Sequence, residues 1–199
     1  MDRRELLKKS ALAMGVTLTG PSLTALLNSC SPSRASLDWT PKFFSVDQAR
    51  AVAAIVDVIL PKSDTAGALE LGVDRFVDTM IDVGYKDDEK SVFKEELDTF
   101  LSECQKTNGN SFEDCLPEEK TALIADQEKN SVKYVRTVWG GNVKEQEPLN
   151  FYRKLKGLIM LGYYTSEEVG KNIFSYDPVP GTQIGCIPLA DVGNSWTEG

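Results

Sequence analysis

From residue 45 onward, apolar residues recur every three to four positions along most of the chain. This is the period of an amphipathic α-helix, and it predicts five main helices. Ser45 and Gln48 form a capping box at the start of the first helix, and Pro61 ends it. Because the apolar side chains of this helix cover most of its circumference, we expect it at the centre of the domain. The predicted ranges are about 46–60, 73–81, 88–104, 117–130 and 151–162.

Two weaker helical segments complete the pattern. The first covers Val132 to Trp139 and is ended by a pair of glycines, and the second is a short turn from Ser166 to Val169. No run of alternating β-branched residues indicates a strand. The sequence therefore predicts an all-α fold, a compact bundle of about five to seven helices. Prolines and glycines beyond residue 172 predict an irregular C-terminal tail from about residue 173, folded over the bundle.

The first 29 residues have the pattern of a cleavable leader. Arg3 and Arg4 lie in a basic opening segment, and an interrupted apolar stretch follows that is too weak for a membrane span. The arginine pair resembles the twin-arginine export signal, a route that carries folded proteins. Cys30 follows Leu-Asn-Ser, which resembles the lipobox of bacterial lipoproteins, in which the cysteine is acylated. An ordinary thiol in a linker is the alternative.

These signals predict the organisation and the location of the chain. Residues 1–29 form the signal peptide, residues 30–44 a lipidated flexible tether, and residues 45–199 a single helical domain. We expect the mature protein on the periplasmic side of a bacterial membrane, held there by the lipid on Cys30.

Charge and histidine content restrict the chemistry. The whole chain has 22 basic and 30 acidic residues, and removal of the leader leaves 18 and 28, a formal charge of −10. Such an acidic body repels phosphate backbones, so nucleic acid is not an expected partner. The chain contains no histidine, which excludes Ser-His-Asp catalysis and His-ligated metal sites. We predict no catalytic, cofactor-binding or metal site, and an independent carboxylate-based enzyme is the least favoured class.

Three cysteines remain if Cys30 is lipidated. Cys104 and Cys115 flank a turn, and an exported protein can keep a disulfide between them. Both also lie at apolar positions, so two buried free thiols are the alternative. Cys186 is expected to be unpaired and buried.

Two further groups of residues have alternative interpretations. Asp64, Glu70 and Asp74 offer carboxylates for a cation, but local turn and helix-start hydrogen bonds are the favoured explanation. Aromatic residues concentrate in the last third of the chain, beside irregular backbone. They suit core and edge packing, and also a protein-contact surface. These aromatics are Trp139, Tyr152, Tyr163, Tyr164, Tyr176 and Trp196.

Two segments resemble the gluconate 2-dehydrogenase subunit 3 family. The first is Leu-Pro-Lys-Ser-Asp-Thr-Ala-Gly-Ala at 60–68, followed by Gly-Val-Asp-Arg-Phe-Val-Asp at 72–78. The second is Leu-Gly-Tyr-Tyr-Thr-Ser-Glu at 161–167, after an apolar helix. The closing segment 176–186 resembles the tail of Bacteroidetes-type members. Ala66 stands where the family often has proline.

The resemblance implies a non-catalytic small subunit of an exported sugar or polyol dehydrogenase complex. The large subunit of such complexes is a flavoprotein of the glucose-methanol-choline type, so FAD is expected in that partner, and a cytochrome c subunit is a further candidate partner. The small subunit escorts the large one through export and anchors it at the membrane. The candidate partner interface comprises Asp64, Thr65, Gly67, Tyr163, Tyr164, Tyr176 and Trp196.

The alternative function needs no partner subunit. It is a free-standing periplasmic lipoprotein that binds a glycan or another ligand on the aromatic residues Trp139, Tyr163, Tyr164 and Trp196.

Overall fold

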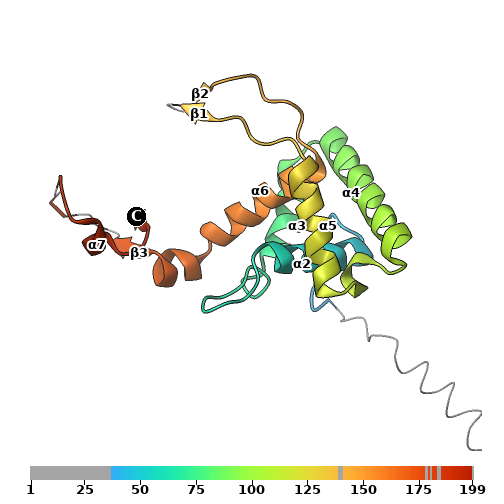
Figure 1. Ribbon diagram of the computed structural model, residues 1–199, viewed down its shortest axis with the longest axis horizontal. Helices are drawn as coiled ribbons and strands as arrows, with labels where there is room; N and C mark the ends of the chain where they lie inside the picture. Colours follow the sequence, from blue (N-terminus) through green and yellow to red (C-terminus); the bar gives the residue numbers. More distant parts are fainter. Residues whose placement is uncertain (1–36, 139–140, 178, 180, 183–184, 199) are drawn as a thin grey trace, which may run out of the picture. The chain divides into compact units, whose positions relative to one another are not determined.

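The computed structural model describes residues 37–138, 141–177, 179, 181–182 and 185–198 (Figure 1). Arg3, Arg4, Cys30 and Trp139 lie outside these residues. The leader, the export route and the lipid therefore stay predictions. Among the described residues, no helix combines the length and the apolar character that crossing a membrane requires.

Five helices build the body of the described chain, and their positions match the predicted main helices. The capping box forms as expected, since Ser45 N–H donates to Gln48 Oε1 and Gln48 N–H donates to Ser45 Oγ, at 3.0 and 3.2 Å. Gly109, at φ +75°, ends the third helix in the left-handed conformation. The helices are α2 (Val46–Ile59), α3 (Val73–Gly84), α4 (Asp87–Asn108), α5 (Pro117–Asn130) and α6 (Phe151–Tyr164). The all-α prediction is confirmed.

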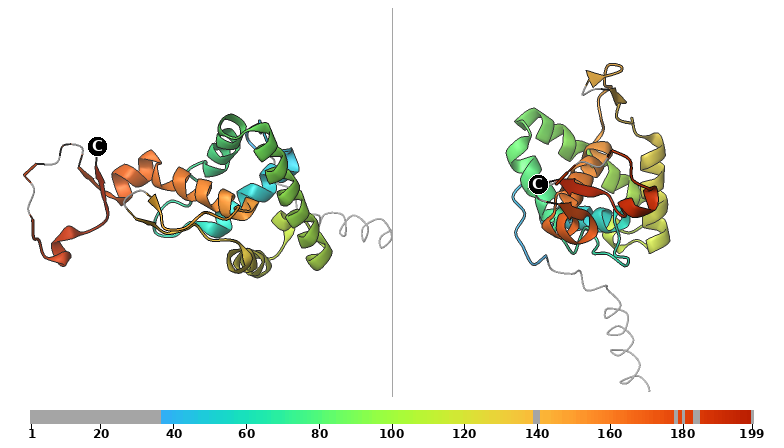
Figure 2. Two further views of the ribbon diagram at one scale, coloured as in Figure 1. Left: turned by 90° about the horizontal axis from the view of Figure 1, so that it is seen from above. Right: turned by 90° about the vertical axis from the view of Figure 1, so that its left-hand side faces the viewer.

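The core lies where α2 and α6 meet the other helices. α2 contacts α3 and α5, and α6 contacts α3, α4 and α5 (Figures 1 and 2). Aromatic rings connect α4 to α6. Phe93 of α4 lies edge-on to Phe151 of α6, with ring centroids 6.1 Å apart. Burial of each large apolar side chain contributes about 1.5–3 kcal/mol. The largest fully buried side chains include Ile55, Val77, Ile81, Phe93, Leu97, Phe112, Tyr152, Leu155 and Ile159.

The segment between α5 and α6 differs from its prediction. Residues 132–138 are not helical; Thr137–Val138 is strand β1 and pairs antiparallel with β2, Gly141–Asn142. The helix predicted for Val132 to Trp139 is therefore wrong over its described residues. β-Branched side chains stiff at χ1 favour the extended chain here, and the Gly-Gly pair that follows favours reversal. We call residues 133–147 the β1–β2 arm (Figure 1).

Residues 37–44, expected to be part of the flexible tether, are bound to α3. Asp78 accepts hydrogen bonds from three consecutive backbone N–H groups, those of residues 42–44, at 2.8, 3.1 and 3.0 Å. Asp74 accepts one from Trp39 Nε1 at 3.2 Å, and Arg75 forms an ion pair with Asp38. Leu37, Trp39 and Phe43 pack against the core. Residues 37–44 therefore pack as part of the helical domain.

The C-terminal tail contacts itself more than the helices. A π-helix, η2 (Val169–Ile173), extends the short turn predicted at 166–169, and β3 (Ser175–Asp177) pairs parallel with β4 (Trp196–Glu198). A single helical turn, α7 (Leu189–Val192), lies between these strands in the chain, and Leu189 is 87% exposed. β3 neighbours η2 and β4. The expected packing of the tail over the bundle is not observed for the described residues.

The cysteines of the described residues are free thiols. Cys104 and Cys115 are buried, and Cys115 Sγ lies 3.4 Å from the carbonyl oxygen of Ser111 and 3.5 Å from Asn108 Nδ2. Burial, together with the nearby Cys115, raises the pKa of the Cys104 thiol to about 12. Of the two alternatives, this structure has the free thiols. Cys186 is unpaired as expected, but it is exposed and not buried.

Candidate functional site

The loop after α2 is a closed, internally bonded turn. Ala68 N–H donates to Leu60 O at 3.0 Å, which closes the loop at its base. Glu70 bridges its two sides, accepting from Lys62 Nζ through one oxygen and from Gly67 N–H through the other, at 2.5 and 3.2 Å. These bonds, that of Lys62 foremost, hold the pKa of Glu70 below its ordinary value. The loop therefore presents a fixed backbone although it contains no regular element.

Gly67 lies where its backbone packs closely against the backbone of Lys62, which leaves no room for a side chain. A Cβ at this position would lie 2.7 Å from the backbone nitrogen of Lys62, a distance that side chains do not tolerate. Gly72 has a separate role, because it precedes α3 in the left-handed conformation at φ +67°. The two glycines explain why the loop motif has its particular spacing.

A hydrogen bond joins this loop to the end of α6. Tyr163 Oη donates to Ala66 O at 3.0 Å, across 97 positions of the sequence. One residue earlier, Gly162 lets α6 lie against α3, since a Cβ there would meet the Phe76 ring at 2.6 Å. The two segments that carry the family resemblance therefore form one surface. We call residues 61–72 together with 161–174 the loop–helix junction.

The two neighbouring tyrosines at the loop–helix junction differ in their exposure to solvent. Tyr163 is 9% exposed, whereas the neighbouring Tyr164 is 45% exposed. The Tyr164 ring stacks on Phe174, with centroids 5.8 Å apart and planes 8° apart. Leu161 is also about half exposed. The outer side thus combines a rigid aromatic pair with a nearby aliphatic side chain.

The predicted interface residues have different roles in the structure. Asp64 and Thr65 are exposed in the loop, while Gly67 and Tyr163 are buried and hold it in place. Tyr176 and Trp196 lie in the paired strands β3 and β4, where Ser175 is opposite Trp196 and Tyr176 is opposite Thr197. The loop–helix junction therefore brings together Asp64, Thr65, Gly67, Tyr163 and Tyr164. Burial of Tyr163 also removes one ring from the proposed glycan platform.

The carboxylates weighed as a cation site do not converge. Glu70 is paired with Lys62, and Asp74 accepts from Trp39. Burial raises the pKa of Asp74, against the opposing effect of its hydrogen bonds. Over the residues that the structure describes, no group of three or more histidines, cysteines or carboxylates has a metal-binding arrangement. The local hydrogen bonds favoured from the sequence account for Glu70, whereas the side-chain partner of Asp74, Trp39, lies 35 positions away.

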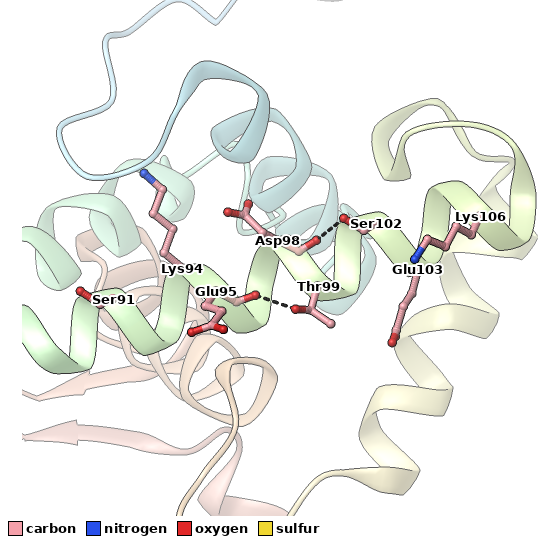
Figure 3. Close-up of a pocket in the computed structure, with 8 residues that line it drawn as sticks. All are labelled: Ser91, Lys94, Glu95, Asp98, Thr99, Ser102, Glu103 and Lys106. Atoms are coloured by element: carbon pink, nitrogen blue, oxygen red, sulfur yellow. Dashed lines mark hydrogen bonds between the residues drawn. The ribbon is translucent and has the colours of Figure 1, made fainter.

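Two of the surface hollows in the described part of the chain bear on the choice of site. The first, of about 450 Å³, lies between α2 and α5 and reaches the loop–helix junction at Pro61 and Leu69. Its lining is mainly small and apolar, with Ala53, Ala54 and Val58 from α2. The second, of about 650 Å³, is lined only by side chains of α4 (Figure 3). There the hydroxyls of Thr99 and Ser102 donate to carbonyl oxygens of their own helix, which is typical of a solvated helix face.

Sequence reasoning missed two groups that hold the domain together. Asp74 and Asp78 bind the segment before α2, and Glu128 of α5 binds Arg153 and Lys156 of α6 at 3.0 and 2.7 Å. The partners of Asp78 are 34 to 36 positions away, and those of Glu128 are 25 and 28 positions away. No local pattern connects such residues, so a single sequence gave no signal for them.

Comparison with known proteins gives one match. The family model of gluconate 2-dehydrogenase subunit 3 matches residues 46–181, which includes the whole loop–helix junction and the β1–β2 arm. Neither the curated proteins nor the solved structures provide a match. Because the family model covers more than half of the chain, the chain belongs to the gluconate 2-dehydrogenase subunit 3 family.

Proposed function

We propose that this chain is a non-catalytic accessory subunit that escorts a flavoprotein dehydrogenase through twin-arginine export and anchors it at the membrane. Its family is that of a gluconate 2-dehydrogenase subunit, which implies association with other subunits. The partner is a large subunit of the glucose-methanol-choline type that carries FAD, and the complex oxidises a sugar or polyol. In this proposal the lipid on Cys30 is the anchor.

The bond from Tyr163 Oη to Ala66 O is the observation that carries the proposal. It fixes a polar loop next to an exposed aromatic pair, Tyr164 and Phe174, so the surface is rigid before any partner binds. Rigid aromatic residues that lie at the centre of a contact area contribute much of the binding free energy of protein complexes. The mainly apolar hollow between α2 and α5 adjoins this loop at Pro61 and Leu69. The loop–helix junction therefore has the composition of a subunit interface.

Escort follows from the export route. The twin-arginine pathway carries folded proteins, so a subunit with the signal can take a folded, cofactor-loaded partner across with it. A flavoprotein must bind FAD before export if the cofactor is supplied in the cytoplasm. The small subunit then needs only a stable interface, a signal and an anchor, and no reacting group of its own.

Co-purification from native membranes tests this function. The tagged full chain is expected to bring with it a larger subunit with flavin absorbance near stoichiometric amounts. Tyr164→Ala should weaken this complex by about tenfold or more, because it removes a central aromatic contact. Val83→Ala, at an apolar side chain on α3 that is 76% exposed, is the matched control and should leave it unchanged. A membrane-bound chain without any flavoprotein would contradict the proposal.

A further inference from the structure

Two buried thiols, those of Cys104 and Cys115, have no part in the proposed function. Cys104 lies on the last turns of α4, and Cys115 directly follows a 3₁₀-helix, η1 (Phe112–Asp114). The two residues are 1% and 5% exposed. The structure has both as free thiols, which is the reduced form of the chain. An exported chain, by contrast, enters a compartment in which disulfides form and persist.

The hydrogen bonds of Cys115 place its thiol beside the turn of α4 that carries Cys104. Asn108 lies four positions after Cys104 on this helix, so the two residues are neighbours on one helix face. A helical side chain covers the turn before its own Cα, so the Asn108 amide extends toward Cys104. This amide donates to Cys115 Sγ at 3.5 Å. The sulfur of Cys115 therefore lies over the stretch of helix that carries Cys104.

A ring contact one turn earlier fixes the same alignment. Phe100 of α4 packs against Phe112 of η1, with ring centroids 5.7 Å apart. Phe112 is thus beside Phe100, and Cys115 is beside Asn108, so Cys104 lies between the two contact points. The nearby Cys115 also contributes to the raised pKa of the Cys104 thiol, which agrees with a short distance between the two groups.

The turn that joins the two cysteines can move without loss of the main helices. Buried cysteines are commonly inert packing residues, and this is the alternative interpretation of the pair. Here, however, the chain is exposed at residues 109–110 and again at 116–118, on either side of the buried part of the turn. Exposed turns of this kind open locally while the core stays folded. Such an opening makes the Cys115 thiol accessible and allows the small backbone adjustment that disulfide geometry requires.

We propose that Cys104 and Cys115 form a disulfide after export, with a thiol–disulfide oxidoreductase of that compartment as the oxidant. The Cys115 thiolate attacks the disulfide of the oxidoreductase, which gives a mixed disulfide and releases one of its two cysteines as a thiol. The Cys104 thiolate then attacks Cys115 Sγ and displaces the second cysteine. Two electrons pass to the oxidoreductase, whose disulfide becomes a dithiol. This inference rests on the proposed function only for the export of the chain.

The disulfide would connect the end of α4 to the start of α5. It closes a short loop, residues 105–114, and so restricts the unfolded chain more than the folded one. In the cytoplasm the thiols stay reduced, and the turn keeps its freedom while the chain folds. The covalent link is then added where the protein works and where no cytoplasmic chaperone can refold it.

The first test uses the purified full chain, reduced with dithiothreitol and then treated with oxidised glutathione. Trypsin cuts after Lys106, which is exposed between the two cysteines, so only a disulfide keeps peptides 95–106 and 107–120 together. Non-reducing mass spectrometry should detect this linked pair. The oxidised chain should unfold about 5–10 °C above the reduced chain. Cys186→Ser, at the exposed thiol of the tail, is the matched control and should give the same linked pair and the same shift.

The second test compares the same chain in two compartments. Cells are quenched with acid, and free thiols are blocked with maleimide before digestion. The chain recovered from membranes should contain the linked pair. A chain expressed without residues 1–29, which therefore stays in the cytoplasm, should have both thiols blocked.

The contrary results are distinct from one another. Absence of the linked pair after treatment with oxidised glutathione would overturn the proposal, and so would free thiols in the chain recovered from membranes. A link from Cys186 to either residue would assign a different pair. None of these results affects the proposed function, which depends on co-purification of a flavoprotein. A chain that forms the disulfide and brings no flavoprotein would support this inference and contradict the proposed function.

Discussion

Tyr163 and Tyr164 are neighbours in the chain, but their environments are opposite. Tyr163 is buried and its hydroxyl holds the loop after α2, whereas Tyr164 is half exposed and stacks on Phe174. Successive residues on a helix lie about 100° apart, so one can face the core while the next faces outward. Tyr163 therefore holds the loop–helix junction together, and Tyr164 is exposed on its surface.

Tyr163→Phe separates these two roles. The variant keeps the ring and removes the donor to Ala66 O, so we expect a loss of about 1 kcal/mol in the free energy of unfolding. Urea denaturation followed by circular dichroism measures it. Tyr164→Phe is the matched control and should change stability by less than about 0.5 kcal/mol. Equal effects of the two substitutions would mean that the Tyr163 bond does not fix the loop.

At the scale of elements, α3 organises the start of the domain. Its residues Asp74 and Asp78 are 5% and 1% exposed, and both accept hydrogen bonds from the segment that precedes α2. The segment has no regular secondary structure of its own, so its backbone donors are satisfied by these carboxylates. Burying backbone N–H groups without partners costs free energy, which is why one carboxylate can hold a whole stretch of chain.

Asp78→Ala should therefore release residues 42–44. Three backbone donors lose their acceptor at once, and we expect a loss of about 2–4 kcal/mol in the free energy of unfolding. Amide hydrogen exchange of these residues should accelerate more than that of α6. Asp82→Ala, on the same helix and in a partly exposed pair with Lys90 at 3.9 Å, should cost less than about 1 kcal/mol. Protected amides at 42–44 in Asp78→Ala would contradict this role.

Glu128 connects α5 to α6 and makes stability depend on pH. Lys156 foremost, with Arg153 and Tyr152, holds the pKa of Glu128 at about 2, below its ordinary value of 4.5. A depressed pKa means that the folded protein binds this proton less readily than the unfolded chain. The stabilisation is therefore complete above about pH 4.5 and is lost as the pH falls toward 2. The side chain is 37% exposed, so solvent screens the pair and we expect only about 1 kcal/mol.

The substitution Glu128→Gln tests whether the charge of Glu128 stabilises the folded protein. The variant should be less stable than the wild type at pH 6, and the difference should shrink toward pH 2.5 as the wild-type carboxylate is protonated. Thermal unfolding across this range measures it. Glu118, exposed in the first turn of the same helix, serves as the control for removal of an acidic residue. If the stability difference between the variant and the wild type stays constant with pH, the charge on Glu128 is not its source.

The sequence predicted the helices well where the hydrophobic periodicity was strong, but it predicted tertiary contacts poorly. The stripe of Val73, Val77 and Ile81 gave α3 because each of these positions is buried. The β1–β2 arm was missed, although Val135, Thr137 and the following glycine pair are a hairpin signal, because a short apolar run suits either period. The loop–helix junction was found only as two separate motifs. Their connection, through Tyr163 and Ala66, depends on tertiary folding that no local pattern records.

At the scale of the whole molecule, the loop–helix junction joins segments that are far apart in the sequence. Its loop follows α2, its helix end belongs to α6, and the bond from Tyr163 to Ala66 connects them. The surface therefore exists only in the folded domain, which suits a partner that is bound before it is exported.

Replacing the arginine pair tests escort directly. In the combined variant Arg3→Lys and Arg4→Lys, the proposed twin-arginine signal is weakened while charge and the folded domain are retained. If the small subunit carries the flavoprotein, both proteins should accumulate in the cytoplasm as a complex that still contains flavin. Cell fractionation with immunodetection of each subunit measures this, and Lys8→Arg with Lys9→Arg is the matched control. Normal export of the flavoprotein in the arginine variant would mean that it crosses by its own route, which would leave the small subunit as an anchor without the escort role.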